Sequence, residues 1–211
     1  MNCGASAYFG KEMKMSKIIA VTSGKGGTGK STVCAGLGYT LAKQGHRTLL
    51  IELDFGLRCL DIMFGMENDI KNDLGDVLSG KKQALDAVSS VPMAANLNIL
   101  CAPKNLVSVT AQQIYDICSS VKKYFEYIII DTGAGINSHV FDIVEQANLI
   151  LVVSTPDLVG FAAHVFRFDF TNFSTIRINR CVLLSFTDNA ININVFKNNS
   201  WCCIVASIEI I

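Results

Sequence analysis

Residues 24–31 read Gly24-Lys25-Gly26-Gly27-Thr28-Gly29-Lys30-Ser31, which matches the pattern G-x-x-x-x-G-K-[ST] at every fixed position. Glycines let the backbone curl so that successive N–H groups point inward at phosphate oxygens. A helix that begins at the end of the loop adds the positive end of its dipole. Lys30 is then placed to reach the β- and γ-phosphates, and the Ser31 hydroxyl is an oxygen ligand of the kind that Mg²⁺ prefers. The stretch therefore predicts a phosphate-binding loop, or P-loop.

The residues on both sides of this loop supply the strand and the helix that a P-loop needs. Residues 17–22 are a short β-branched run, and its continuous apolarity is typical of a strand covered on both faces. Residues 30–44 predict a helix, and Gly45 supplies its stop. The helix carries apolar residues at helical spacing, which are Val33, Leu37 and Leu41.

The alternation of strand and helix continues along the chain. Further buried strands are expected at 48–53, 97–102, 127–130 and 149–154, and further helices at 111–124 and 138–147. Residues 62–80 have the composition of a loop with one or two short helices. Strands that alternate with helices form right-handed βαβ units. The predicted fold class is therefore α/β, a mainly parallel sheet flanked by helices, of the P-loop NTPase type.

The composition of the 211-residue chain excludes several classes of protein. Half of the residues are apolar, 17% are charged, and the 18 basic side chains balance the 18 acidic ones. A disordered chain has low hydrophobicity and usually a net charge, and a protein that binds nucleic acid by bulk electrostatics has a basic excess. No apolar run approaches the roughly 20 residues that span a bilayer, and we recognise no signal peptide. We expect a cytoplasmic protein with no nucleic-acid partner.

The eight cysteines are expected to be reduced thiols, most of them in the core. They include no C-x-x-C pair, and the three histidines are isolated from one another. Several cysteines lie in apolar stretches, as Cys101 does within residues 99–102. A zinc or iron–sulfur site needs clustered ligands. Buried free thiols are typical of the cytoplasm.

Carboxylates are expected beside the P-loop, because the carboxyl ends of parallel strands meet at one edge of the sheet. The apolar residues 127–130 end at Asp131, which is the Walker B arrangement, with the carboxylate near Mg²⁺. A turn-capping aspartate is the alternative for that position. Glu52 and Asp54 close the second strand, and carboxylates two residues apart on a strand point to the same side. One of them is expected to hold the metal's waters or to orient an attacking water, and a solvated turn is the alternative.

Four motifs that occur in order resemble the MinD/ParA family of deviant Walker A ATPases, members of the SIMIBI class, and its MinD branch most. Lys25 inside the loop makes the pattern K-G-G-x-G-K-[ST]. Residues 54–61, Asp-Phe-Gly-Leu-Arg-Cys-Leu-Asp, are similar to D-x-G-L-R-N-L-D. Residues 131–136 are similar to D-[ST]-[PGA]-A-G-I, and residues 154–157 to T-T-P-[ED]. The resemblance covers residues 15 to about 160, and Arg58 favours the MinD branch over the flagellar-number ATPases (FlhG).

The resemblance implies that two subunits enclose two ATP molecules with Mg²⁺ and that the dimer depends on ATP. Lys25 would reach the partner's phosphates, Lys30 would act within its own subunit, and Asp54 would position the attacking water. Hydrolysis would be slow without a protein activator. The implied nucleotide-binding residues are Gly24, Lys25, Gly26, Gly27, Thr28, Gly29, Lys30, Ser31, Thr32 and Asp131. The implied Mg²⁺ site, partly through water, consists of Ser31, Asp54 and Asp131.

The implied role is a switch that regulates the placement of the cell-division site. Alternatives are a flagellar-number regulator, an iron–sulfur carrier ATPase, a ParA-type DNA-segregation ATPase and a defective fragment with little activity. The absence of a C-x-x-C pair and the neutral charge argue against the carrier and the ParA type. The family's association with the inner face of the membrane is also implied, although its basic amphipathic helix is not recognised at this C-terminus.

The sequence departs from the family pattern at three places. Glu52 stands where MinD proteins commonly carry aspartate, and its role stays open. Cys59 replaces an asparagine. The last 51 residues, after Gly160, contain neither glycine nor proline and match the family little. We therefore expect a flexible extension at 1–14, a P-loop ATPase core at 15–160 and an atypical segment at 161–211. That segment is either a non-homologous replacement or a divergent β-rich end with a strand at 182–186.

Overall fold

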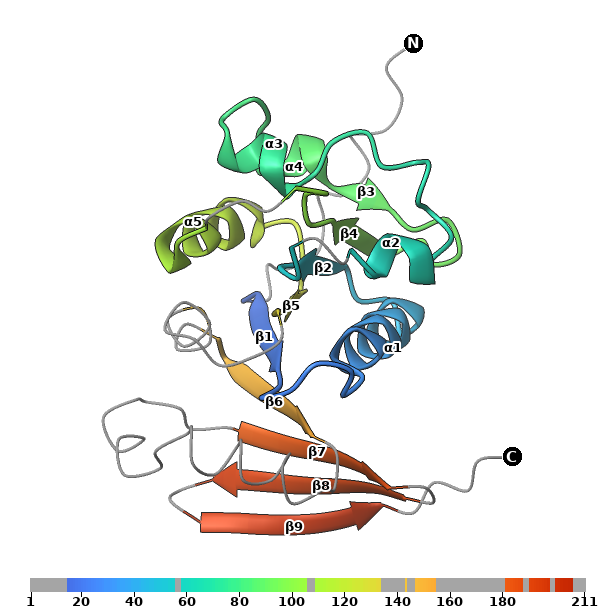
Figure 1. The fold of residues 1–211 in the computed structure, drawn as a ribbon, viewed down its shortest axis with the longest axis vertical. Coiled ribbons are helices and arrows are strands. Elements are labelled where there is room, and N and C mark those ends of the chain that lie inside the picture. Colours follow the sequence, from blue (N-terminus) through green and yellow to red (C-terminus); the bar gives the residue numbers. More distant parts are fainter. Residues whose placement is uncertain are drawn as a thin grey trace.

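The computed structural model describes residues 15–55, 58–105, 109–133, 143, 147–154, 181–187, 190–197 and 200–206. Within these residues, no helix is both long enough and apolar enough to cross a bilayer. The chain forms one sheet with the strand order β3-β4-β2-β5-β1-β6-β7-β8-β9 (Figure 1). The parallel strands that follow the sequence predictions are β1 (Lys17–Thr22), β2 (Thr48–Glu52), β4 (Leu97–Leu100), β5 (Tyr127–Asp131) and β6 (Leu149–Ser154).

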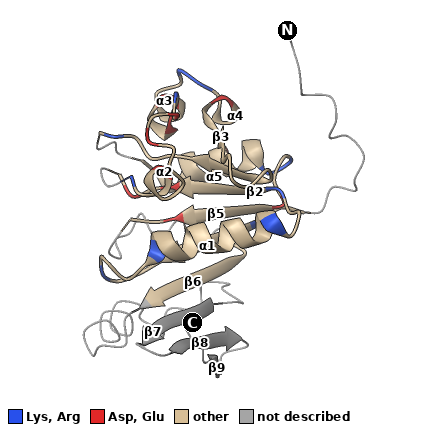
Figure 2. Cartoon of the chain, turned by 90° about the vertical axis from the view of Figure 1, so that its right-hand side faces the viewer, with Lys and Arg blue, Asp and Glu red and all other residues tan. Residues whose placement is uncertain are grey.

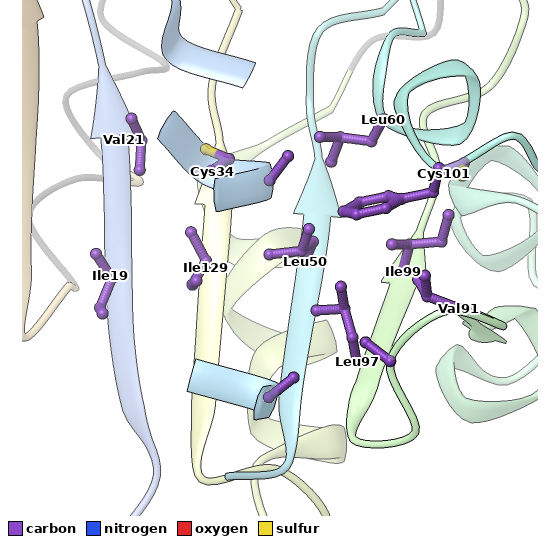
Figure 3. Close-up of a cluster of buried hydrophobic side chains, with 14 of the residues drawn as sticks. Ile19, Val21, Cys34, Leu50, Leu60, Val91, Leu97, Ile99, Cys101 and Ile129 are labelled. Atoms are coloured by element: carbon purple, nitrogen blue, oxygen red, sulfur yellow. The ribbon is translucent and has the colours of Figure 1, made fainter. Parts of the chain in front are cut away.

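Helices cover both faces of this sheet, with α1 (Lys30–Lys43) on one face and α5 (Ala111–Val121) on the other (Figure 1). The short helices are α2 (Leu60–Met63), α3 (Leu74–Leu78) and α4 (Ala84–Ala87). One apolar cluster joins α1 to the sheet, and Figure 3 shows Ile19, Ile129 and Leu50 side by side on neighbouring strands within it. A second cluster joins α5, α3 and α4 to the opposite face. The central strands are therefore buried on both sides, as their continuous apolarity predicts.

The mainly parallel sheet is confirmed, because neighbours from β4 through β2, β5, β1 and β6 to β7 all pair in parallel. The expected loop at 62–80 contains the end of α2 and all of α3. Helix α5 ends at Val121, earlier than predicted, because the Tyr124 N–H bonds to the Val121 carbonyl in a tighter turn. The antiparallel edge strand β3 (Ser89–Ser90) was not predicted, since two serines carry no apolar pattern. The helix predicted at 138–147 lies almost wholly outside the described residues.

The C-terminal part continues the sheet with three strands. β7 (Cys181–Thr187) includes the strand predicted at 182–186 and pairs in parallel with β6. β8 (Ala190–Lys197) and β9 (Ser200–Ala206) follow in antiparallel pairing. Figure 1 shows these three strands at the far edge of the sheet from β3. The strand predicted at 182–186 is therefore present within β7.

The contact of α1 with the sheet is closest at small residues, although the apolar residues noted in the sequence also pack against the same cluster. Val33, Leu37 and Leu41 are only partly buried, whereas the buried positions of the helix are Lys30, Cys34, Ala35, Gly38 and Ala42. A Cβ atom added at Gly38 would lie 2.6 Å from Leu50 Cδ2 and 3.2 Å from Leu97 Cδ1. The helix therefore approaches β2 and β4 more closely than a larger side chain permits.

We expect Gly38→Val to lower the free energy of unfolding by about 2–3 kcal/mol, because overpacking a fully buried contact forces the helix away from the sheet. Gly36→Val on the same helix is the matched control, since nothing lies within 4 Å of a Cβ at Gly36. The control is expected to change stability by no more than about 0.5 kcal/mol. Urea unfolding of both variants measures the difference. Equal stability of the two variants would contradict the close approach of α1.

Candidate functional site

The carboxyl ends of β1, β5 and β2 meet at one edge of the sheet. Asp131 is in register with Val21 of β1 and with Glu52 of β2. The P-loop follows β1 directly, so it lies at this edge, where the chain first crosses from β1 over β5 to β2. Figure 2 shows an acidic end of β5 on the same side of the molecule as a basic end of α1. Ligands of open α/β sheets bind at such a point.

The backbone of the P-loop has the conformation that its glycines predict. Gly27 and Gly29 have φ angles of 74° and 90°, values at which a Cβ atom is strained. The Ser23 hydroxyl donates to the Lys25 carbonyl over 2.7 Å, and the Val33 N–H bonds to the Gly29 carbonyl over 2.9 Å. The first helical bond of α1 therefore starts at the last glycine of the loop. The N–H groups of its first turn have no acceptor within the helix and are available to an anion.

The two lysines of the loop lie in different environments. Lys30 is only 5% exposed, although a cationic side chain is rarely buried without a partner. Its charge acts on Asp131, whose pKa it lowers. Lys25 is exposed, as are Gly26 of the loop and Thr32 of α1. The buried lysine therefore faces the site, and the exposed lysine is placed where a second molecule can meet it.

Asp131 is a fully buried carboxylate whose oxygens both lack a hydrogen-bond partner among the described residues. Burial raises the pKa of this carboxyl, and the nearby Ser31 hydroxyl and Lys30 ammonium lower the pKa in part. The Ser31 hydroxyl and the Cys34 thiol both lie close to the carboxylate. The hydroxyl of the buried Thr28 is likewise unpartnered among the residues that the structure describes. A buried carboxylate and a hydroxyl without partners form an oxygen donor set that fits hydrated Mg²⁺ and phosphate.

The half-buried Asp54 lies just beyond the end of β2 and also borders the Walker B strand. A Cβ atom added at Gly133 would lie 3.8 Å from Asp54 Oδ1. The Leu53 N–H donates to the Asp131 carbonyl over 2.8 Å, which ties the residue before Asp54 to β5. The Asp54 charge also raises the pKa of Asp131. The structure thus brings Asp54 to the same edge as Asp131, Lys30 and Ser31.

Glu52 and Asp54 have separate surroundings, although the sequence treats them as one pair. Glu52 is fully buried and accepts three backbone N–H bonds, from Cys59, Leu60 and Ala102. Asp54 instead borders Gly133. The strand ends at Glu52, so the alternation rule for strands does not extend to Asp54.

Sequence reasoning missed two residues of this site. Cys34 is fully buried, and its contact with the Asp131 carboxylate contributes, after burial, to a pKa well above the usual thiol value. Its spacing of four residues from Lys30 is the signal that places both side chains on one face of α1. The Thr132 hydroxyl donates to the Val21 carbonyl over 3.0 Å and ties β5 to the start of the P-loop. Residues 56–57, 134–136 and 155–157 of the recognised motifs lie outside the described residues.

We expect Asp131→Asn to raise the melting temperature of the nucleotide-free chain by about 2–4 °C, because it removes a charge whose burial opposes folding, an effect of about 1 kcal/mol. The folded-state pKa of Asp131 is raised, so ionisation opposes folding at neutral pH and ceases to do so as the pH falls through that pKa. The gain is therefore expected to be largest near pH 7 and to shrink toward pH 4. Thermal melting of both proteins at several pH values measures it.

Asp69→Asn, at an exposed aspartate, is the control for this prediction, and its melting temperature should follow the wild type at every pH. Mg²⁺ should stabilise the wild type in the presence of nucleotide and leave Asp131→Asn unchanged. A variant that melts below the wild type at pH 7 would show that Asp131 has partners that stabilise its charge.

The comparisons with known proteins point to one family. The model of the CobQ/CobB/MinD/ParA nucleotide binding domain matches residues 19–151. The septum site-determining protein MinD of Thermotoga maritima is 41% identical over 148 residues, which are 68% of this chain and 54% of that protein. MinD of Bacillus subtilis is 37% identical over 147 residues, 68% of this chain and 55% of that protein. The chain therefore spans about half the length of the curated relatives it matches.

Solved structures give the same result. A MinC:MinD cell division protein complex of Aquifex aeolicus matches with a TM-score of 0.69 at 29% sequence identity. The match covers 80% of this chain and 68% of the chain in that complex. The septum site-determining protein MinD of Pyrococcus horikoshii, solved with Mg-ADP, has a TM-score of 0.68 at 25% identity, with 80% and 70% covered. The fold therefore agrees with that of solved MinD proteins.

Proposed function

The chain belongs to the CobQ/CobB/MinD/ParA nucleotide-binding family, and from that membership we propose that it is an ATP-binding, slowly hydrolysing dimerisation switch of the MinD type. Its role would be to regulate the placement of the cell-division site, as the names of its relatives suggest. The observation that carries the proposal is the buried Asp131, which lies close to Lys30 and Ser31 of the P-loop. Neither of its carboxylate oxygens has a hydrogen bond of good geometry among the described residues. The other functions weighed from the sequence have no comparable support.

The residues of the site would have different roles in nucleotide binding and hydrolysis. The loop N–H groups from Gly24 to Thr32 and the Lys30 ammonium would hold the phosphates. Ser31 and Asp131 would hold Mg²⁺, Asp131 partly through water. Bound Mg²⁺ would neutralise charge that develops on the phosphoryl oxygens. Asp54 would orient the attacking water, because its half-buried carboxylate borders the same edge of the sheet.

We infer that the active form is a homodimer that depends on ATP. Lys25 supports this inference, since it is exposed while its neighbour in the motif, Lys30, is buried. It would neutralise phosphate charge in the partner subunit, as an arginine finger does. A protein that activates hydrolysis is also proposed, and the complex solved for the Aquifex aeolicus relative supports partner binding in general.

The proposed ATPase core is residues 15–160, which contains the whole stretch matched by the family model. We propose that the protein is cytoplasmic, and the free, buried thiols of Cys34, Cys101 and Cys118 support this proposal. Association with the inner face of the membrane follows the resemblance alone. Vesicles of anionic lipid, incubated with the protein and ATP and then sedimented, test it.

Two measurements on the wild-type chain test the proposed function. Titration with Mg-ATP measures binding, and light scattering with ATP and with ADP measures the mass in solution. We expect binding of both nucleotides, the mass of two chains with ATP and the mass of one chain with ADP. A chain that binds neither nucleotide, or that keeps one mass under both conditions, would overturn the proposal and favour the defective fragment.

A further inference from the structure

Glu52 closes β2 with a carboxylate that is held by three backbone groups. Its Oε1 atom accepts from the N–H of Cys59 over 2.5 Å and from the N–H of Leu60 over 3.0 Å. Its Oε2 atom accepts from the N–H of Ala102 over 3.3 Å. Burial raises the pKa of Glu52, and the bonds from Leu60, Cys59 and Ala102 lower it in part. One carboxylate therefore joins the start of α2 to the residues that follow β4.

These bonds hold one end of the loop that contains Asp54. The other end is held by the Leu53 N–H, which donates to the Asp131 carbonyl over 2.8 Å. Between these two attachments, Arg58 has a φ of 40°. That conformation costs a residue other than glycine about 1–2 kcal/mol, so neighbouring contacts must maintain it.

Arg58 is the second part of the attachment. Its guanidinium is buried, and Nε donates to Asp61 over 2.6 Å. Its Nη1 atom lies 4.0 Å from a carboxylate oxygen of Asp73, the N-cap of α3. The Arg58 side chain thus links this segment to Asp61 and Asp73, while Glu52, at the end of β2, binds the backbone of the same segment. Asp54 lies between two fixed points.

We propose that Glu52 is a positioning residue for the hydrolysis step: it fixes the backbone at Cys59 and Leu60, beyond Asp54, and so sets the place of the Asp54 carboxylate. The inference rests on the proposed function, because it concerns the rate at that same site. The geometry requires a carboxylate. Three N–H donors share two oxygens, and a glutamine has a single acceptor oxygen and would turn an N–H toward the remaining donor. An aspartate is one methylene shorter and reaches one of the two attachments less well.

The N–H groups that donate to Glu52 belong to Cys59, Leu60 and Ala102, outside the P-loop, so the proposal separates rate from affinity. A glutamate that only stabilises the fold would, when replaced, lower the melting temperature and weaken ATP binding and hydrolysis together. A positioning residue changes the turnover number and leaves the dissociation constant of ATP nearly unchanged. A displacement of about 1 Å at a reacting group is enough to lower a rate by up to about a hundredfold.

The test compares Glu52→Gln and Glu52→Asp with the wild type under saturating Mg-ATP in a single-turnover hydrolysis assay. ATP titration and thermal melting are recorded on the same preparations. We expect Glu52→Gln to hydrolyse ATP at least about tenfold more slowly, with ATP affinity within about twofold of the wild type. Glu52→Asp should recover part of the rate. Glu67→Gln, at an exposed glutamate beyond α2, is the matched control and should behave as the wild type.

The outcomes that overturn the inference differ from those that overturn the proposed function. A wild-type chain without ATP hydrolysis overturns both, and it is detected before any variant is made. An active wild type with a Glu52→Gln variant of equal rate overturns the inference alone, as does an equal loss of affinity and rate. Should Glu52→Gln not fold, the Glu52→Asp variant decides, and a wild-type rate in it overturns the inference.

Discussion

Lys30→Ala is expected to weaken ATP binding at least about a hundredfold, which corresponds to about 2.7 kcal/mol. Lys30 is buried at the start of α1, where its charge acts on Asp131. In the variant, the ATP phosphates lack the Lys30 ammonium of the subunit that binds them. The loss is large because charge interactions inside a buried site are stronger than in water. Titration calorimetry with Mg-ATP measures the loss.

Lys43→Ala is the matched control for this prediction, because Lys43 is the last residue of the same helix and is exposed. Its loss is expected to cost the helix about 0.3–1 kcal/mol through the dipole and to leave ATP affinity unchanged. The melting temperature of Lys30→Ala shows whether the variant is folded. A folded Lys30→Ala variant with wild-type affinity would remove Lys30 from the nucleotide site.

Asp54→Ala is expected to slow ATP hydrolysis at least about a hundredfold while the chain still binds ATP. The carboxylate that would orient the water is then absent, and the loop that carried it is still held by the Leu53 bond to Asp131 and by Glu52. Because dissociation of the proposed dimer requires hydrolysis, the ATP-bound dimer should persist. Light scattering over time after ATP addition should show the mass of two chains without decay, whereas the wild type returns to one chain.

Asp69→Ala removes an exposed aspartate of the same charge and should hydrolyse ATP and dissociate as the wild type does. If the Asp54→Ala dimer dissociates at the wild-type rate, a residue other than Asp54 orients the attacking water. Together with the Glu52 variants, this experiment distinguishes the side chain that would orient the water, Asp54, from the side chain that would hold Asp54 in place, Glu52.

Much of the fold follows from local patterns in the sequence. β1 and β6 begin and end at the predicted residues, because the sequence of a strand buried on both faces is a continuous apolar run. The P-loop and the start of α1 follow from glycine spacing, since few backbone shapes satisfy that spacing. Asp131 was found by its position at the end of an apolar strand.

The errors arose where packing outweighs pattern. The apolar spacing in α1 indicates a helix but does not reveal that Cys34 and Gly38 are among its most buried positions, where the helix lies close to Leu50. The two-residue edge strand β3 is formed by pairing with β4 rather than by its own composition. Neither effect is visible within a window of neighbouring residues.

The sequence by itself determined that this chain has a P-loop, a parallel α/β core and a Walker B aspartate, because each is defined by residues adjacent in the chain. Only the tertiary structure decided that Glu52 and Asp54 have separate surroundings. The division depends on Cys59, Leu60 and Ala102, whose N–H groups reach Glu52 from other parts of the fold. A buried carboxylate takes the donors that surround it, and those donors are known only when the chain is folded.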